Sequence, residues 1–232
     1  MPKKYFAIVP ARGGSKGIPN KNISLLGGKT LLEHTFNVIS SNPLIYDHIL
    51  STDSGEIADI GKNLGMNVPF LRPPELASDH STAIEVCRHI DLWCEQEYDE
   101  NIDAYIYLQP TSPLRTEKQV EEAIYLFEKE DPDTLVSVTE VPHSFLSFSQ
   151  YRMFKNQLER VTVGEEGYDR FKKERLWARN GPAILIFKKH QLKKESFYNG
   201  EVIGFKMDRT TSLDIDEPLD LKIAELFLKE LV

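Results

Sequence analysis

Residues 5–22, YFAIVPARGGSKGIPNKN, join a short apolar run to a loop rich in glycine and positive charge. The run Tyr5–Val9 is typical of a buried strand. Glycines follow at 13, 14 and 17, and glycine lets a backbone adopt positive φ and approach a ligand closely. The cations of this loop are Arg12, Lys16 and Lys21. Such a loop after a first strand favours phosphate groups.

No acidic residue lies between Met1 and Gly28 to neutralise the loop. Successive N–H groups in such a loop can form a concavity that binds anions. The G-x-G-x-x-G of dinucleotide folds is absent, and Gly28-Lys29-Thr30 does not end a P-loop because that motif's first glycine would fall at Ile23. The loop predicts phosphate binding of another kind; the alternative is a solvated basic turn.

The composition indicates one globular domain with a substantial core, since the chain has 232 residues and is 41% hydrophobic and 28% charged. A net charge of −8 disfavours a nucleic-acid partner. No apolar run approaches the roughly 20 residues of a membrane helix, and no signal-peptide pattern is present. Cys87 and Cys94 are spaced too far apart on a predicted helix for a disulfide. We expect a cytoplasmic protein with reduced cysteines and no membrane partner.

Strand and helix patterns alternate along most of the chain. Strands are predicted at 5–9, 48–51, 67–71, 104–108, 134–139, 182–187, 201–207 and 212–215, and helices at 31–40, from a cap at 52–54 to 64, at 81–97, 116–130 and 217–231. This order predicts an α/β fold, a mostly parallel sheet of right-handed βαβ units with helices on both faces. Ligands bind beyond the carboxyl ends of such strands, so loops 10–22, 72–79 and 109–115 are the candidates.

Residues 141–179 break this alternation. The segment holds seven aromatic residues among alternating charges and no clean βα repeat. A long irregular stretch inside a compact domain is usually functional or an interaction element. We predict an interface here, inserted at about 140–178; the alternative is a surface loop.

Asp214-Ile215-Asp216 forms a second anchor. If this segment is a strand, both carboxylates point the same way and Ile215 turns into the core. Neighbouring carboxylates repel unless a cation or proton lies between them, and magnesium is typically held by one or two carboxylates together with substrate phosphates. The alternative is a strand end at which Asp216 caps the final helix.

The loop Gln109–Arg115 follows the fourth predicted strand and is stiffened by two prolines. A buried glutamine amide and an arginine fork can hold the hydroxyls and the carboxylate of a sugar. The alternative is a stiff turn with Arg115 on the surface.

Five separated motifs resemble those of the acylneuraminate cytidylyltransferases, also called CMP-sialic acid synthetases. They are PARGGSKGIPNKN at 10–22, RPPELASD at 72–79, QPTSPLR at 109–115, RNGPA at 179–183 and SLDIDEPLDL at 212–221. The resemblance implies a three-layer, Rossmann-like, nucleotide-diphospho-sugar transferase fold in one domain, residues 1–232. It also implies transfer of CMP from CTP to the anomeric hydroxyl of a nine-carbon 2-keto sugar acid, with release of pyrophosphate.

The same resemblance implies roles for single residues. The catalytic set is Arg12, Lys16, Lys21 and Asp216. The nucleotide-binding set is Ala11, Arg12, Gly13, Ser15, Lys16, Lys21, Asn22, Arg72 and Ser81, in which Arg72 reads the cytosine. The sugar-binding set is Gln109, Ser112, Arg115, Arg179 and Asn180. Asp214 and Asp216 bind Mg²⁺, with Mn²⁺ as a substitute, and the general base is either a metal-linked hydroxide or Asp216.

One motif departs from the family, because Arg179 is adjacent to Asn180 and Pro182 is inserted after the glycine. Asn180-Gly181 is equally consistent with a tight turn alone. In the family the 140–178 segment packs against a second subunit, so a homodimer is expected. Two alternatives stay open: nucleotidyl transfer to another acceptor, such as Kdo or a sugar 1-phosphate, and a catalytically silent nucleotide-sugar-binding protein.

Overall fold

The computed structural model describes residues 3–15, 17–98, 102–146, 149–161 and 175–231. Its main sheet has the order β11-β6-β10-β5-β1-β4, with β9 paired to β6. The strands are β1 (Tyr5–Pro10), β4 (Ile45–Ser51), β5 (Ala104–Tyr107), β6 (Thr134–Glu140), β9 (Trp177–Arg179), β10 (Leu185–Lys188) and β11 (Val202–Lys206). β1 pairs parallel with β4 and β5, and β11 parallel with β6, whereas β10 and β9 run antiparallel to their neighbours. The predicted mostly parallel sheet is confirmed.

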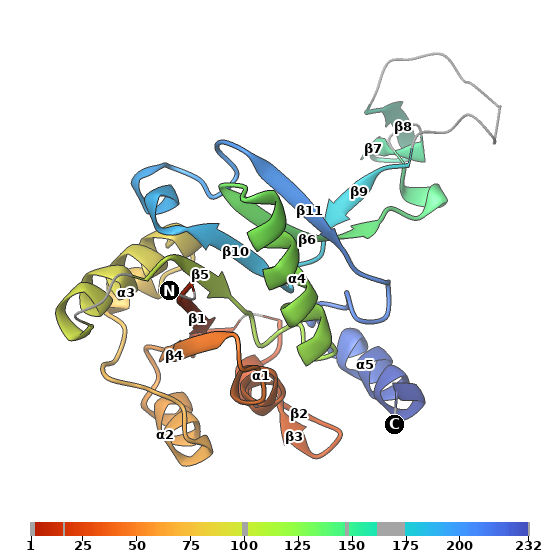
Figure 1. Ribbon diagram of the computed structural model, residues 1–232. Helices are drawn as coiled ribbons and strands as arrows, with labels where there is room; N and C mark the ends of the chain where they lie inside the picture. Colours follow the sequence, from red (N-terminus) through yellow and green to blue (C-terminus); the bar gives the residue numbers. More distant parts are fainter. Residues whose placement is uncertain (1–2, 16, 99–101, 147–148, 162–174, 232) are drawn as a thin grey trace.

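Five helices surround this sheet in the described part of the chain (Figure 1). They are α1 (Leu31–Ser40), α2 (Gly55–Leu64), α3 (Ala83–Glu97), α4 (Glu117–Glu130) and α5 (Pro218–Leu231). The first four begin at a Thr or Ser whose hydroxyl accepts a backbone N–H of the first turn, and α3 and α4 have complete capping boxes. Gly65 ends α2 at φ 94°, in the left-handed conformation that glycine adopts readily.

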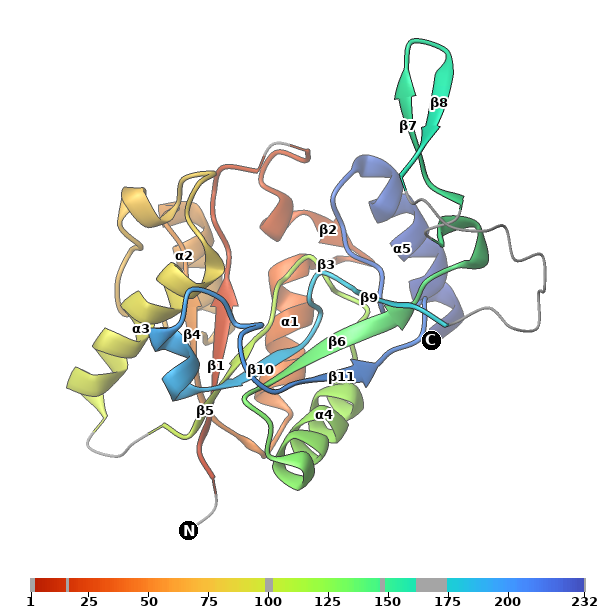
Figure 2. The ribbon, with the colours of Figure 1, turned by 90° about the horizontal axis from the view of Figure 1, so that it is seen from above.

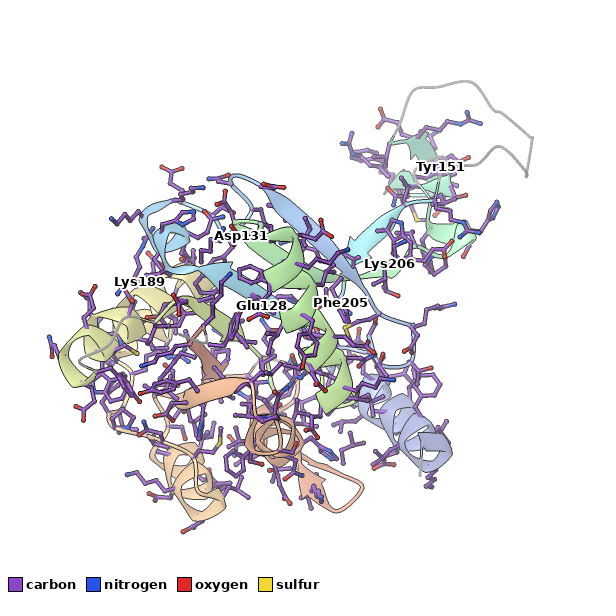
Figure 3. The ribbon with its side chains drawn as sticks, viewed as in Figure 1. Glu128, Asp131, Tyr151, Lys189, Phe205 and Lys206 are labelled. Carbon is purple, nitrogen blue, oxygen red and sulfur yellow. The ribbon has the colours of Figure 1, made fainter. Side chains whose placement is uncertain are left out.

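Short elements fill the connections. They are the 3-10 turns η1 (Lys21–Ile23), η2 (Pro74–Leu76), η3 (His143–Phe145) and η5 (Lys189–Lys193), the pair β2 (Leu25–Leu26) and β3 (Lys29–Thr30), and the hairpin β7 (Tyr151–Phe154) with β8 (Gln157–Arg160). Figures 1 and 2 show this hairpin standing away from the sheet, and Figure 3 shows Tyr151 on it.

Alternating side chains of β1 fill two separate cores. Tyr5, Ala7 and Val9 pack with α1, α2 and α4 on one face. Phe6 and Ile8 pack with α3 and the aromatic side chains near β10 on the other face. This period of two makes the strand apolar throughout, because both its faces are covered. The result is the predicted three-layer arrangement.

A third, smaller core holds the site segments in place. Ile18 from the glycine-rich loop packs with Leu114 and Ile215 against α5, where Ala224 is fully buried. The loop and the Asp214–Asp216 segment are therefore anchored to the same helix, although they lie near opposite ends of the chain.

Two predicted strands are wrong. Residues 67–71 run beside β4 but form only isolated bonds at the ends, Leu50 N–H to Asn67 O at 2.9 Å and Arg72 N–H to Thr52 O at 2.7 Å. Pro69 in this segment has no N–H to donate to a ladder. Residues 212–215 are also not a strand, because Ser212 and Leu213 donate their N–H groups to Asp208 and Thr210 in a turn.

Cys87 and Cys94 are free and buried, as expected from their spacing. Burial raises the pKa of both thiols, so they are core residues without thiolate chemistry. No helix in the described ranges is long and apolar enough to cross a membrane.

Candidate functional site

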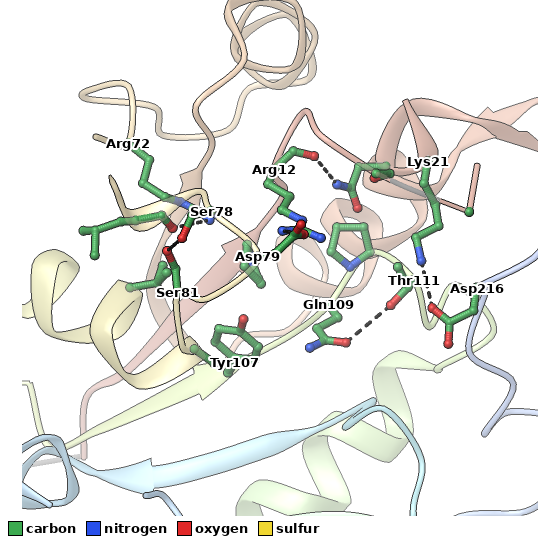
Figure 4. A pocket seen from close by; sticks show the side chains of 18 of the residues that line it. Arg12, Lys21, Arg72, Ser78, Asp79, Ser81, Tyr107, Gln109, Thr111 and Asp216 are labelled. Carbon is green, nitrogen blue, oxygen red and sulfur yellow. Dashed lines mark hydrogen bonds and ion pairs between the residues drawn. The ribbon is translucent and has the colours of Figure 1, made fainter. Parts of the chain in front are cut away.

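A pocket of about 470 Å³ lies beyond the carboxyl end of β1. All three loops selected from the sequence line it, joined by Asp214 and Asp216 (Figure 4). From the glycine-rich loop come Arg12, Ser15, Gly17, Lys21 and Asn22, from the 72–81 segment Arg72, Leu76, Ser78, Asp79 and Ser81, and from the β5 end Tyr107, Gln109, Pro110 and Thr111. The expectation that these loops meet at one edge of the sheet is confirmed.

The glycine-rich loop is fixed by hydrogen bonds to neighbouring segments and within itself. Gly13 N–H donates to Asp53 Oδ1 at 2.9 Å, and the Asn22 side chain donates to Arg12 O at 2.9 Å. Ala11 is fully buried and donates its N–H to Ser51 O. Ala11 and Gly13 therefore shape the loop from behind, while Arg12, Ser15 and Asn22 line the pocket.

The described cations of this loop are paired with acids from distant parts of the chain. Arg12 Nη1 lies 3.0 Å from Asp79 Oδ1, and Lys21 Nζ lies 2.9 Å from Asp216 Oδ1. The sequence offered no acid within the loop itself, so the tertiary structure supplies this neutralisation. Lys16, which the sequence also assigned to phosphates, lies outside the described residues.

Gly17 brings the glycine-rich loop against the Asp214–Asp216 segment. A Cβ at this position would stand 2.3 Å from the Asp216 main-chain oxygen, a distance no side chain tolerates. Because residue 17 has no side chain, the glycine-rich loop can lie this close to the Asp214–Asp216 segment.

The two carboxylates reach the pocket without forming a strand. Ile215 is fully buried and donates its N–H to Thr111 O at 2.7 Å, which turns Asp214 and Asp216 to the pocket side. Asp216 does not cap α5; Asp220 accepts the N–H groups of Asp216 and Glu217 instead.

The environments of the two carboxylates differ. Asp216 has a side chain that is 73% exposed, whereas Asp214 Oδ1 is buried and accepts no hydrogen bond from any described residue. Burial raises the pKa of Asp214, and the charge of Asp216 acts in the same direction. An orphaned carboxylate oxygen beside an accessible carboxylate fits a divalent cation such as Mg²⁺, which prefers hard oxygen ligands.

Arg72 lines one wall of the pocket. It is 5% exposed, and its Nε donates to Ser51 Oγ at 3.0 Å while Nη2 donates to Ser51 O at 2.5 Å. Ser81 Oγ donates to Glu75 O at 2.6 Å and contacts Ser78 Oγ at 2.8 Å. These bonds fold residues 72–81 into a fixed wall of the pocket.

A second pocket of about 350 Å³ adjoins the first, because Tyr107 and Gln109 line both. Gln109 Oε1 accepts a hydrogen bond from Thr111 Oγ1 at 3.4 Å, which orients the Gln109 side chain. The Arg179 guanidinium lies 4.1 Å from the centre of the Tyr198 ring, and both side chains line the second pocket. Its apolar wall comes from Ile84, Pro182, Leu185 and Phe197.

Three members of the sugar-binding set lie behind these walls. Ser112 and Arg115 are buried and line neither pocket. Asn180 is also buried, where it accepts from Ser137 Oγ at 2.6 Å and donates to Ser212 Oγ at 2.9 Å. Asn180 thereby ties β6 to the segment before Asp214, which is more than the tight turn considered from the sequence.

Sequence reasoning did not select Asp53, Thr111 or Tyr107 as site residues. Asp53 follows the end of β4 at the same sheet edge, so its place just after the second predicted strand was the signal in the sequence. Asp79 stood in the quoted 72–79 motif, but its pairing with Arg12 depends on tertiary contacts.

The family model described as Cytidylyltransferase matches residues 6–230, nearly the whole chain. The chain belongs to the cytidylyltransferase family.

Two relatives illustrate the range of this family. The CMP-N,N'-diacetyllegionaminic acid synthase of Legionella pneumophila is 30% identical over 230 residues, covering 97% of this chain and 97% of that protein. The N-acylneuraminate cytidylyltransferase of Streptococcus agalactiae serotype III is 31% identical over 218 residues, covering 92% of this chain and 50% of that protein. This cytidylyltransferase chain thus spans about half the length of the streptococcal relative.

Among solved structures, the CMP:2-keto-3-deoxy-manno-octonic acid synthetase complexed with CTP matches with a TM-score of 0.73. The match covers 99% of this chain and 100% of that one at 15% identity, which shows a shared fold. The fold expected of a cytidylyltransferase is confirmed.

Proposed function

We propose that this chain transfers CMP from CTP to the anomeric hydroxyl of a nine-carbon 2-keto sugar acid, sialic acid or a related nonulosonate, and releases pyrophosphate. The observation that carries the proposal is the meeting of the glycine-rich loop and the Asp214–Asp216 pair in one pocket. The names of the streptococcal and Legionella relatives support the acceptor class.

In the proposed reaction the anomeric hydroxyl gives its proton to a general base, for which Asp216 is the candidate on this chain. The hydroxyl oxygen forms a bond to the α-phosphorus as the bond from that phosphorus to the pyrophosphate oxygen breaks. Arg12, Lys21 and, on the sequence evidence, Lys16 neutralise the triphosphate and the leaving group. Ser15 Oγ donates to a phosphate oxygen. The wall at Arg72 and Ser81 receives the base, with Arg72 held in place by Ser51.

Asp214 and Asp216 would hold a magnesium ion, because one offers an unpartnered buried oxygen and the other an accessible carboxylate. When bound, the ion supplies positive charge to phosphate oxygens in the reaction. Lys21 then exchanges its Asp216 partner for phosphate, so its charge stays compensated in both states.

The second pocket would hold the acidic sugar. Gln109 stands at the junction of the two pockets, where an acceptor must reach the nucleotide. Arg179 supplies a cation for the acceptor carboxylate, and the apolar wall suits the less polar substituents of a nonulosonate.

The chain would act as a homodimer in the cytoplasm, with the 140–178 segment at the interface. On this segment, β7 and β8 expose Met153 by 69%, Phe154 by 63% and Leu158 by 59%. Exposed apolar side chains of this size on a projecting hairpin favour a protein contact.

The test is pyrophosphate release from CTP and Mg²⁺ across a panel of acidic sugars, with Asp216→Ala beside wild type. Turnover with one nonulosonate, lost in Asp216→Ala and kept in the neighbouring Glu217→Gln, is the expected result. Turnover with Kdo alone would reassign the acceptor. CTP binding without turnover on any sugar would favour the catalytically silent binder.

A further inference from the structure

Arg115 is a buried cation that faces neither pocket. It is 3% exposed, and its hydrogen-bond partners among the described residues are uncharged oxygens. Burial lowers its pKa, and Asp214 is the carboxylate near enough to act in the opposite direction. Burying a guanidinium without a direct ion pair costs free energy, and its hydrogen bonds must offset that cost.

The guanidinium fork joins three separate segments. Nη1 and Nη2 each lie 3.2 Å from Gln109 O, at the end of β5. Nη1 also donates to Ala183 O at 2.6 Å, just before β10, and Nη2 donates to Thr35 Oγ1 at 2.9 Å, in α1. The Thr35 hydroxyl donates onward to Leu31 O, which leaves its oxygen free to accept.

Two of these segments form the acceptor side of the site. Gln109 lines both pockets, and Gly181 and Pro182, which precede Ala183, line the second. Fixing the carbonyls of Gln109 and Ala183 against α1 therefore fixes the separation between the two walls of that pocket.

We propose that Arg115 is a positioning residue for the acceptor, acting through Gln109 and the 181–183 segment and leaving CTP binding to other groups. This inference rests on the proposed function. Lysine cannot replace Arg115 in this role, because its compact ammonium group lacks the rigid fork of donors that reaches Gln109 O, Ala183 O and Thr35 Oγ1 together.

The test is Arg115→Lys, assayed for the acceptor KM, the kcat and the Kd of CTP. The acceptor KM is expected to rise about tenfold or more, because small misplacements of a positioning group have effects of this size. The Kd of CTP, measured by calorimetry, is expected to stay within about twofold of wild type. Tyr98→Phe removes a part-buried hydrogen bond to Asp47, and because neither residue lines either pocket it controls for lost stability alone.

A double-mutant cycle with Gln109→Ala isolates the route. If Arg115 acts in part through Gln109, Arg115→Lys raises the acceptor KM by a clearly smaller factor in the Gln109→Ala background than in wild type, and the remaining rise reports the route through residues 181–183. The proposal would be overturned if the effects of the two substitutions on the acceptor KM multiplied in full. It would also be overturned if Arg115→Lys raised the Kd of CTP by the same factor as the acceptor KM.

Thr35→Val keeps the arginine and removes one of its acceptors, and it replaces Arg115→Lys if that variant does not fold. It is expected to raise the acceptor KM by a smaller factor, and an unchanged acceptor KM would count against the proposal. Wild type is assayed first with the sugar panel, so its failure to release pyrophosphate sinks the proposed function and is not confused with failure of the Arg115 role.

Discussion

Lys21 Nζ and Asp216 Oδ1 lie 2.9 Å apart although 195 positions separate the two residues in the sequence. The pair joins the glycine-rich loop to the carboxylates that would hold a metal ion. Lys21 is the less accessible partner, with a side chain that is 14% exposed. In the proposed reaction a phosphate entering the pocket would compete with Asp216 for this ammonium group, which would couple nucleotide binding to metal binding.

Gly17→Ala should separate these two segments. The new Cβ meets the Asp216 main-chain oxygen, which must move, and we expect kcat/KM to fall about tenfold or more. Gly14→Ala is the matched control, because a Cβ there has no neighbour within 4 Å. Steady-state kinetics of the two variants checks the prediction, and equal activity would show that the Gly17 contact has no role in catalysis.

Asp214→Asn should separate stability from activity. The raised pKa means that the ionised carboxylate is disfavoured in the fold, so this group's stabilising contribution is lost as pH rises through the folded pKa. At neutral pH the Asn variant should therefore melt at the same temperature as metal-free wild type or above it, with turnover lost. Thermal melts with and without Mg²⁺ test this, and we expect the magnesium-induced rise in Tm only in wild type. A clearly lower Tm for metal-free Asp214→Asn would contradict the argument.

Asp79→Asn should strengthen CTP binding. Asp79 would compete with a bound phosphate for Arg12, and an ion pair with partly exposed side chains contributes about 0.2–1 kcal/mol. Its loss should lower the Kd of CTP by a factor of up to about 5 at low salt, with a smaller effect at high salt. Calorimetric titration at two salt concentrations measures this. Weaker binding would show instead that Asp79 helps to shape the pocket.

Stability should fall in mild acid because of His48. Its Nε2 accepts the Asn67 N–H at 3.3 Å, and burial lowers its pKa, which outweighs the opposite effect of Asp47. A lowered folded pKa gives a contribution that is complete above about pH 6.5, the unfolded value, and is lost as pH falls through the folded pKa. Melting curves between pH 7.5 and 5 should show a smaller decline for His48→Gln than for wild type. The exposed loop variant His80→Gln should follow wild type.

The β7–β8 hairpin should control oligomeric state. Replacing Met153 and Phe154 by aspartate puts charge on an apolar surface and should convert a dimer to monomers. Light scattering at micromolar concentration measures the mass of both forms. A monomeric wild type at that concentration would contradict the proposed homodimer, and the surface substitution Leu92→Asp on α3 serves as a control at an equally exposed apolar residue.

Much of the architecture follows from local patterns. The apolar run of β1 and the caps of the helices are readable because they depend on neighbours in the sequence. Parallel strands bring their carboxyl ends to one edge of the sheet, so the sequence alone assigns three loops to one pocket.

The strands predicted at 67–71 and 212–215 are wrong, because local patterns alone do not define a strand. Extended, apolar segments look alike in a sequence, but a strand also needs a partner that accepts and donates along its length. Neither segment has such a partner along its length: residues 67–71 make isolated bonds at their ends, and Ser212 and Leu213 belong to a turn.

The sequence by itself determined which residue types are present for phosphate and metal chemistry and at which sheet edge they gather. Only the tertiary structure decided which of them are exposed to a ligand. It paired Arg12 with Asp79 and Lys21 with Asp216. It also buried Arg115 behind the pocket wall, although the sequence assigned this residue to the sugar-binding set. The physical reason is that charge compensation and burial depend on distances in space, which residues far apart in the chain supply together.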